Sequence, residues 1–308
     1  MRNAVYVLLF TLCFADPAVA EDVPPAAAQN AEQLVMKLRG LSPCGQYIDV
    51  SSKVSIELRY PRIFDAPSSF LNAAERGDTF AQVRVGGMYL LGWDVVRDEE
   101  KAVQWWRIAA EKGNADAQLK LGMIGTEGLS KSVSQADAVT WYRRAAEQGN
   151  RDAQFNLGGV YENGCGVAKD YVEAVRWYRR LADDGDYQAQ FHLAMMYESG
   201  RGVAKDDAEA VRLYRKAAKH GLIAAQVNLG VMYETGRGVD TDFAEAVVLY
   251  RRAIRHGDPA ATFHLGLMYA SGRGVRKNQA EAIRLLEAAD AWTYPGASEA
   301  LAKLRSGR

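Results

Sequence analysis

The sequence predicts an all-α protein, a right-handed α/α solenoid of about six 36-residue helix-turn-helix repeats with partial capping repeats. Glycines recur at a constant spacing of 36 residues, and an alanine stands four residues after each of them. Between the glycines, apolar residues follow helical spacing, and a fixed period in this range is typical of helical repeat proteins. We define a repeat offset as the number of residues after the period glycine. The period glycines are Gly77, Gly113, Gly149, Gly185, Gly221 and Gly257.

The first helix of each repeat is predicted to begin after an aspartate or asparagine, whose side-chain oxygen accepts a backbone N–H that otherwise has no partner. It presents Ala, Leu, Met and Tyr at offsets 4, 8, 11 and 12 as one apolar stripe. Small residues at offset 9 would allow a neighbouring helix to approach closely. A glycine at offset 15 is expected to end the helix, because glycine adopts the left-handed conformation without steric cost. The capping residues are Asp78, Asn114, Asn150, Asp186 and Asp258.

The second helix of each repeat is predicted to begin after an aspartate in four repeats and to end at the next period glycine. It carries alanine, valine and a Trp/Leu-Tyr pair on one side and arginines on the other. Because neither helix is long enough to be stable alone, stacking of neighbouring repeats must bury the apolar faces. The aspartates are Asp98, Asp170, Asp206 and Asp242.

Three regions are expected along the chain: a cleaved leader at 1–20, a linker and N-terminal cap at 21–66, and the solenoid at 67–308. Six full repeats should occupy 78–293, with a partial repeat before them and a capping helix after them that ends near Leu304. The second repeat is degenerate, because Gly125 replaces its tyrosine and a different loop replaces its GxGV turn.

The first 20 residues have the pattern of a secretory leader. Arg2 precedes a short apolar run at 4–14, and Ala-Val-Ala at 18–20 is a cleavage site. Cleavage near Ala20 predicts a periplasmic or secreted protein. No apolar run approaches the ~20 residues that span a bilayer, so no transmembrane segment is expected in the mature chain. A lipid anchor at Cys13 is disfavoured, because no small residue precedes it closely.

The composition describes an ordinary soluble protein without a polyanionic partner. The chain has 38 Lys and Arg against 38 Asp and Glu, a formal net charge of +0, with 48% hydrophobic and 25% charged residues. Nucleic acid is therefore not expected as a partner. Once Cys13 is removed, Cys44 and Cys165 remain and could pair in an oxidising compartment, although the sequence does not decide this.

These columns are similar to Sel-one-like repeats, relatives of the tetratricopeptide repeat with a slightly longer unit. The resemblance rests on A-x-F/V-N/H-L-G/A-x-M-Y-E-x-G-R-G-V, followed by E-A-V-x-W/L-Y-R-x-A-A and G, and covers about four-fifths of the chain. It implies a helical solenoid that serves as an adaptor between other proteins, in bacteria for envelope assembly, polysaccharide secretion, signalling or host contact. A cysteine-rich branch is associated with penicillin binding and β-lactam hydrolysis, but its regular cysteine pairs are missing here.

The GRGV segments and the arginine column are interpreted as structural. A phosphate-binding loop follows a strand, whereas GRGV follows a helix and recurs, which favours a turn. The arginines of the second helices could bind an acidic polysaccharide, but glutamates on the same helices partly compensate them, which favours a solvated outer face. They are Arg107, Arg143, Arg179, Arg215 and Arg251.

No catalytic or metal-binding constellation is present, so an enzyme and a cofactor are not expected. The chain contains no HExxH, CxxC or GxSxG motif. His192 and His264 share an offset but lie two repeats apart, roughly 16–20 Å at ordinary helix spacing, so they cannot share a zinc ion.

The polar column at offset 7 of the first helices is the candidate binding surface. It stands opposite the apolar stripe, on the helix that lines the concave surface in tetratricopeptide-like solenoids. The alternative is that these side chains only connect the first helix to its neighbour. The column comprises Arg84, Lys120, Asn156, His192, Asn228 and His264. We therefore expect an exported, non-catalytic adaptor that binds a protein or peptide, with an acidic polysaccharide or cell-wall material as the alternative ligand and a β-lactamase-like hydrolase disfavoured.

Overall fold

The computed structural model describes residues 67–306, which contain helices α4 to α17 and no strand. The predicted leader and the predicted linker and N-terminal cap lie outside the described residues and stay predictions. Among the described helices, none combines the length and the apolar character that crossing a membrane requires. The chain divides into two compact units between Trp177 and Tyr178, within α10, and each is described by itself.

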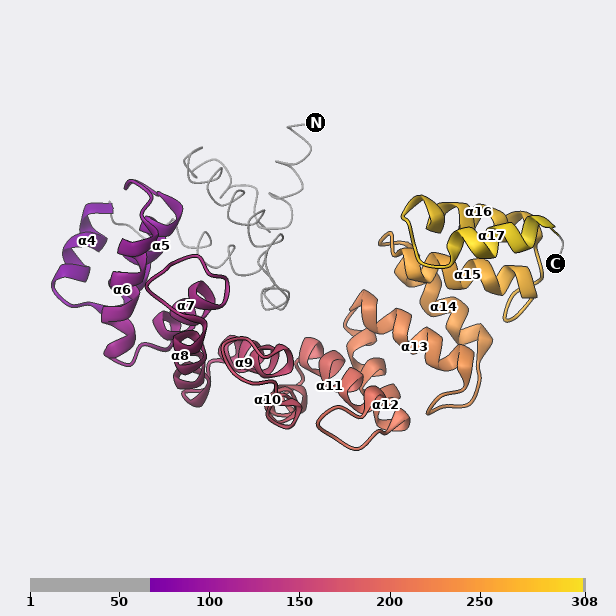
Figure 1. Ribbon diagram of the computed structural model, residues 1–308, viewed down its shortest axis with the longest axis horizontal. Coiled ribbons are helices and arrows are strands. Elements are labelled where there is room, and N and C mark those ends of the chain that lie inside the picture. Colours follow the sequence, from indigo (N-terminus) through magenta and orange to yellow (C-terminus); the bar gives the residue numbers. More distant parts are fainter. Residues whose placement is uncertain (1–66, 307–308) are drawn as a thin grey trace. The chain divides into compact units, whose positions relative to one another are not determined.

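The helices alternate as the repeat pattern predicts, so the all-helical solenoid class is confirmed (Figure 1). The first helices are α5 (Thr79–Leu91), α7 (Ala115–Thr126), α9 (Arg151–Asn163), α11 (Tyr187–Ser199), α13 (Ile223–Thr235) and α15 (Pro259–Ser271). The second helices are α6 (Glu99–Glu111), α8 (Gln135–Glu147), α10 (Tyr171–Asp183), α12 (Asp207–Lys219), α14 (Phe243–Ile254) and α16 (Gln279–Ala291). The flanking helices are α4 (Pro67–Glu75) and α17 (Ala297–Ser306).

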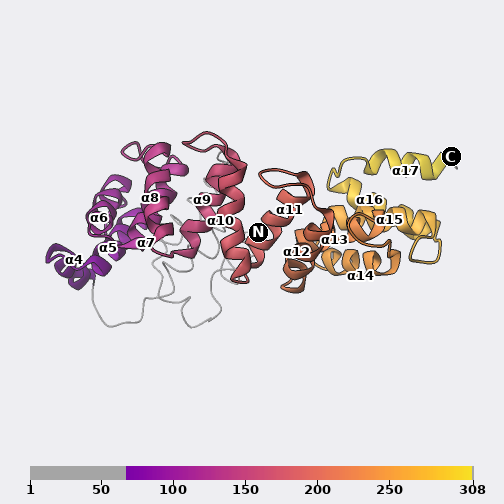
Figure 2. The same ribbon diagram turned by 90° about the horizontal axis from the view of Figure 1, so that it is seen from below.

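Neighbouring helices pack against each other along the chain in both units. In the first unit α4 contacts α5, α5 contacts α6, and the contacts continue through α9. In the second unit α11 contacts α12 and the series runs to α17, which lies beside α16 at the C-terminal end (Figure 1, Figure 2). Each helix of these two series thus packs on its sequence neighbours, as a repeat stack requires.

The predicted helix caps are confirmed. In the first helices the side chain of Asp78 accepts a hydrogen bond from the Ala81 N–H at 2.8 Å, and Asp186 does the same for Ala189. In the second helices Asp206 accepts from the Glu209 N–H at 3.0 Å. These bonds satisfy backbone donors that a helix leaves without partners at its first turn.

Glycine at offset 9 allows the aromatic residue of the second helix to lie on the backbone of the first. A Cβ built on Gly230 would stand 2.6 Å from the ring of Tyr250, and one built on Gly122 would stand 2.4 Å from the ring of Tyr142. Both tyrosines are almost completely buried, at 0% and 1% exposure. The close approach predicted at offset 9 is therefore confirmed, and the group that approaches the glycine is the tyrosine at offset 29 of the same repeat.

The second glycine of the GxGV turn brings neighbouring repeats together. Gly238 has φ +67°, and a Cβ there would lie 2.2 Å from the backbone carbonyl carbon of Asp207, where α12 begins. Gly274 stands equally close to the backbone of Phe243, at the start of α14. The recurrent motif is thus a turn that only glycine fits, as the sequence predicts.

A buried glutamine at offset 5 is a connection that the sequence interpretation missed. Its Nε2 donates to a backbone carbonyl near the end of the preceding second helix, for example from Gln154 to Ala146 at 3.0 Å and from Gln190 to Ala182 at 3.1 Å. The bond satisfies a terminal helix carbonyl and joins one repeat to the next. The column comprises Gln82, Gln118, Gln154, Gln190 and Gln226.

Candidate partner-binding face

The offset-7 column lies on the first helices, three members in each unit. Arg84, Lys120 and Asn156 lie on α5, α7 and α9 in the first unit. His192, Asn228 and His264 lie on α11, α13 and α15 in the second. Within each unit these side chains share a register, and in the second unit they contact residues of the preceding repeat.

His264 belongs to a network that we call the Glu234 cluster, which comprises Glu234, Tyr250, His264 and Arg273. The Tyr250 hydroxyl donates to Glu234 Oε2 at 3.0 Å, and His264 Nδ1 lies 3.2 Å from the same oxygen. The guanidinium of Arg273 lies 3.1 Å from Glu234 Oε1. Burial by itself raises the pKa of Glu234, but the bonds from His264 and Tyr250 and the Arg273 charge outweigh it, so the pKa lies below its ordinary value.

Asn228 occupies the same place one repeat earlier. Its Nδ2 donates to the Tyr214 hydroxyl at 3.1 Å, and that hydroxyl donates to Glu198 at 2.7 Å. Arg237 completes the arrangement with a bond to the other oxygen of Glu198 at 2.8 Å. Offsets 7 and 16 of one repeat thus meet offsets 13 and 29 of the repeat before. Asn228 and His264 hold neighbouring repeats together, which is the alternative role that the sequence left open.

His192 and His264 of this column also form aromatic pairs. We call the side of the first helices that carries the residues at offsets 6 and 7 the first-helix face. His192 stacks on Tyr178 with ring centroids 5.0 Å apart and meets the edge of Phe191 at 5.6 Å. His264 repeats this geometry, with Tyr250 at 5.3 Å and Phe263 at 5.5 Å. The two phenylalanines and two histidines are only partly buried. The face of α11 and α15 therefore presents a Phe–His pair twice, with α13 between them.

The first unit uses the column differently. The guanidinium of Arg84 lies over the ring of Phe80, 5.9 Å from its centroid, and Lys120 is half-buried on α7. Asn156 is only 4% exposed, and neither its Oδ1 nor its Nδ2 has a hydrogen-bond partner. A buried amide without hydrogen-bond partners costs free energy. Asn156 therefore differs from Asn228, whose amide donates to the Tyr214 hydroxyl.

Glu127 is a second buried polar group of the first unit. It follows α7, is 5% exposed, and neither carboxylate oxygen has a hydrogen-bond partner. Burial raises its pKa to about 7. Sequence interpretation missed Glu127, because it lies in the degenerate loop of the second repeat, where the repeat register predicts nothing. Close by, the loop packs Leu129 and Val133 into the core, and a Cβ on Gly125 would lie 2.8 Å from Val133, which explains the missing tyrosine.

The arginine column faces solvent, as predicted, but each guanidinium also contacts the next repeat. Arg179, Arg215 and Arg251 each donate to the hydroxyl of a tyrosine at offset 12 of the following repeat, at 2.8–3.0 Å. Arg143 makes the same bond to Tyr161. In the degenerate repeat, where glycine replaces that tyrosine, Arg107 bonds the Ser132 carbonyl instead, at 2.9 Å. Both columns share the 36-residue period, so the contact recurs, but the period does not predict which columns meet.

Metal binding finds no support in residues 67–306. They contain no group of three or more His, Cys, Asp or Glu side chains that could hold an ion.

The comparisons with known proteins agree with the repeat register. The Sel1 repeat matches at 79–114, 115–150, 151–186, 188–222, 223–258 and 259–289. One similar solved structure is that of c5321, a protective antigen present in uropathogenic Escherichia coli strains that displays an SLR fold. Its sequence is 32% identical to this chain, its TM-score is 0.74, and the match covers 89% of this chain and 59% of that chain. The present chain thus spans about three-fifths of that protein's solved length.

A second solved structure, a Sel1 repeat protein from Oxalobacter formigenes, is 34% identical with a TM-score of 0.60, over 73% of this chain and 98% of that chain. No curated protein has a significantly similar sequence. Since the six matches together cover more than half of the residues, the chain belongs to the Sel1 repeat family.

Proposed function

We propose that the protein is an exported, non-catalytic adaptor that binds another protein or a peptide on the first-helix face of its repeats. The observation that supports this most directly is the repeated Phe–His pair of α11 and α15. Partly buried aromatic rings beside hydrogen-bonding groups are the side chains that protein interfaces favour, because one ring provides large apolar contact at small entropic cost.

The geometry favours an extended peptide over a small ligand. The pairs recur at one offset on α11 and α15, so a bound segment that runs across the helices would meet the same chemistry at regular intervals. Sel1 repeats suggest protein–protein interaction in general, and the leader pattern at 1–20 supports export. The description of one similar chain as a protective antigen is in keeping with export.

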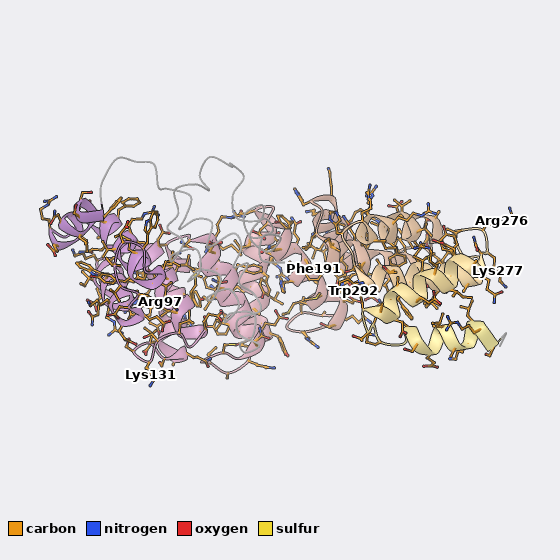
Figure 3. All side chains as sticks on the ribbon, turned by 90° about the horizontal axis from the view of Figure 1, so that it is seen from above. Arg97, Lys131, Phe191, Arg276, Lys277 and Trp292 are labelled. Atoms are coloured by element: carbon orange, nitrogen blue, oxygen red, sulfur yellow. The ribbon has the colours of Figure 1, made fainter. Side chains whose placement is uncertain are left out.

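A photo-crosslinking residue placed at Phe191, which lies on α11 (Figure 3), tests the proposal. The control position is Val248, which is 39% exposed but lies on the second helix α14. Peptides selected from a random library on the full mature protein provide the ligand. We expect crosslinks from position 191 and none from 248, and weaker binding by at least about tenfold in Phe191→Ala, which corresponds to ~1.4 kcal/mol. Equal crosslinking from both positions, or unchanged affinity in Phe191→Ala, would refute the proposed face.

A separate variant tests the offset-7 residues Arg84 and Lys120 of the first unit. Arg84 and Lys120 changed together to alanine should weaken acidic peptides more than neutral ones, because both cations lie at one end of the column. If the double variant and the wild type bind acidic peptides equally at low ionic strength, these two residues do not belong to the binding face.

A further inference from the structure

The last helix, α17, continues the repeat register as the first helix of a seventh, partial repeat. Thr293 stands 36 residues after Gly257 and adopts the left-handed conformation of a period glycine, with φ 55°. Ala297 and Leu301 then occupy offsets 4 and 8, and both are buried like their equivalents in the full repeats. α17 also contacts α15, the first helix before it. This junction can therefore be compared, offset by offset, with the earlier junctions of the second unit.

The residues that bond one repeat to the next are replaced by alanine and leucine at this last junction. The Glu234 cluster places a glutamate at offset 13 and a tyrosine at offset 29 beside a histidine at offset 7 of the next repeat. Between α15 and α17 these offsets hold Ala270, Leu286 and Ala300. Leu286 lies on the offset-9 glycine as the tyrosines do, since a Cβ on Gly266 would stand 3.0 Å from its Cγ. The packing is thus kept, while the carboxylate, the hydroxyl and the imidazole are replaced by alkyl groups.

A groove of about 770 Å³ lies between α15 and α17, and Ala270 and Ala300 are among the residues that line it. Its volume is in the range of known ligand sites, about 300–1,000 Å³. Phe263, Leu267 and Leu304 form apolar walls, and each of them is only partly buried. Because Phe263 belongs to the first-helix face, the groove is continuous with that face.

The rim of the groove is mainly cationic. Among the residues that line it, Arg273, Lys277 and Lys303 stand against one carboxylate, Glu299. Lys303 donates to Glu299 at 2.6 Å, and the guanidinium of Arg273 lies 3.1 Å from Glu234. Lys277 is exposed on the loop before α16 and forms no ion pair within residues 67–306 (Figure 3). An anionic group beside the apolar walls would therefore meet a cation that the repeats leave available.

We propose that this groove binds an acidic peptide segment in which a large apolar side chain stands beside a carboxylate. The apolar side chain enters the space that Ala270 and Ala300 leave, and the carboxylate meets Lys277. The leucine walls favour an apolar side chain over a polysaccharide, whose hydroxyl groups would lose water there without hydrogen-bond partners. The inference rests on the proposed function, because it names the chemistry of the partner at one end of the first-helix face.

Fluorescence anisotropy of the full mature protein with a labelled peptide of alternating phenylalanine and aspartate is the first test. One control peptide has serine in place of every phenylalanine, and the other has lysine in place of every aspartate. We expect the phenylalanine–aspartate peptide to bind at least about tenfold more tightly than either control, because each control loses one of the two contacts.

A variant with a filled groove is the second test. Ala270→Gln combined with Ala300→His places side chains of the size found in the Glu234 cluster at offsets 13 and 7 without adding a carboxylate. Its affinity for the phenylalanine–aspartate peptide should fall at least about tenfold. Lys277→Gln should weaken binding about threefold at low ionic strength, whereas Lys216→Gln, at an exposed lysine of α12, should leave it unchanged. Far-UV circular dichroism verifies that the variants keep their helices.

Several outcomes would overturn the inference. They are equal binding of the three peptides, unchanged affinity in the filled variant, or tighter binding of laurate or alginate than of the phenylalanine–aspartate peptide. If peptides crosslink at position 191 but bind the filled variant as they bind the wild type, the groove is refuted and the proposed function stands. If no peptide crosslinks at position 191 and none binds the groove, both fail.

Discussion

Replacing Glu234 by glutamine tests whether the Glu234 cluster stabilises the junction between the last two full repeats. The carboxylate is only 9% exposed and accepts bonds from Tyr250 and His264, while Arg273 contributes its charge. Glutamine keeps the shape but removes the charge, and one of its terminal atoms becomes a donor that faces other donors. Hydrogen bonds to charged groups contribute about 1.5–3 kcal/mol each, and the half-exposed Arg273 recovers part of the loss from water. We therefore expect a net cost of about 2 kcal/mol.

The assay is urea denaturation of the full mature protein, followed by far-UV circular dichroism. Midpoints are compared, because repeat arrays can unfold stepwise. Glu287→Gln is the matched control, since its ion pair with Arg305 is about half exposed and should cost less than ~1 kcal/mol. A double-mutant cycle with Tyr250→Phe should give a coupling of about 1 kcal/mol.

The pH dependence of the free energy of unfolding provides an independent test of the Glu234 contribution. The folded-state pKa of Glu234 lies below its ordinary value of 4.5, so its contribution is present above pH 4.5 and is lost as the pH falls through the folded-state pKa. The difference between wild type and Glu234→Gln should therefore shrink in acid. A cost below ~0.5 kcal/mol at pH 7, or a difference that grows in acid, would refute the reasoning.

Three further predictions concern other contacts. Burial raises the pKa of Glu127 from 4.5 to about 7, so the free energy of unfolding should fall by up to about 3 kcal/mol between pH 4.5 and 8. Urea titrations of Glu127→Gln should show a smaller dependence of this free energy on pH, and an unchanged dependence would contradict the prediction. Gly230→Ala should lower the thermal midpoint at a cost of about 1–3 kcal/mol, because the added Cβ meets the Tyr250 ring at 2.6 Å; a neutral result would mean that the ring moves aside freely. Tyr233→Phe removes the acceptor of the exposed Arg215 bond and should cost less than ~1 kcal/mol by calorimetry, so a larger loss would show that this column is a main source of stability.

Much of the fold follows from local rules that the sequence displays directly. Asp186 caps α11 because an aspartate before a helix accepts the N–H three residues on. Gly238 follows from the same kind of rule, since a positive φ excludes most other residues. The 36-residue period then implies that whatever one repeat does locally, its neighbours also do.

The candidate site could be predicted only in part. The offset-7 column was visible as a polar column, but its contacts were not: His264 and Asn228 bond a glutamate or tyrosine of the previous repeat, and Asn156 bonds nothing within the repeats. These differences arise from a second column, at offset 13, whose residues differ between repeats. This column has Glu234 next to His264 but Thr126 in the repeat before Asn156. Which columns meet depends on how successive repeats are rotated and shifted, which periodicity does not specify.

The sequence by itself determined the helical class, the repeat length, the helix caps and the turn glycines, because each depends on residues within a few positions of one another and recurs with the period. Tertiary structure alone decided that the tyrosine ring lies on the offset-9 glycine, that the arginine column bonds the next repeat, and that Glu127 is buried. These features join residues from different helices, and the free energy of burial or of a hydrogen bond depends on what surrounds a group in three dimensions. A regular period predicts which residues are equivalent, whereas only packing decides which of them touch.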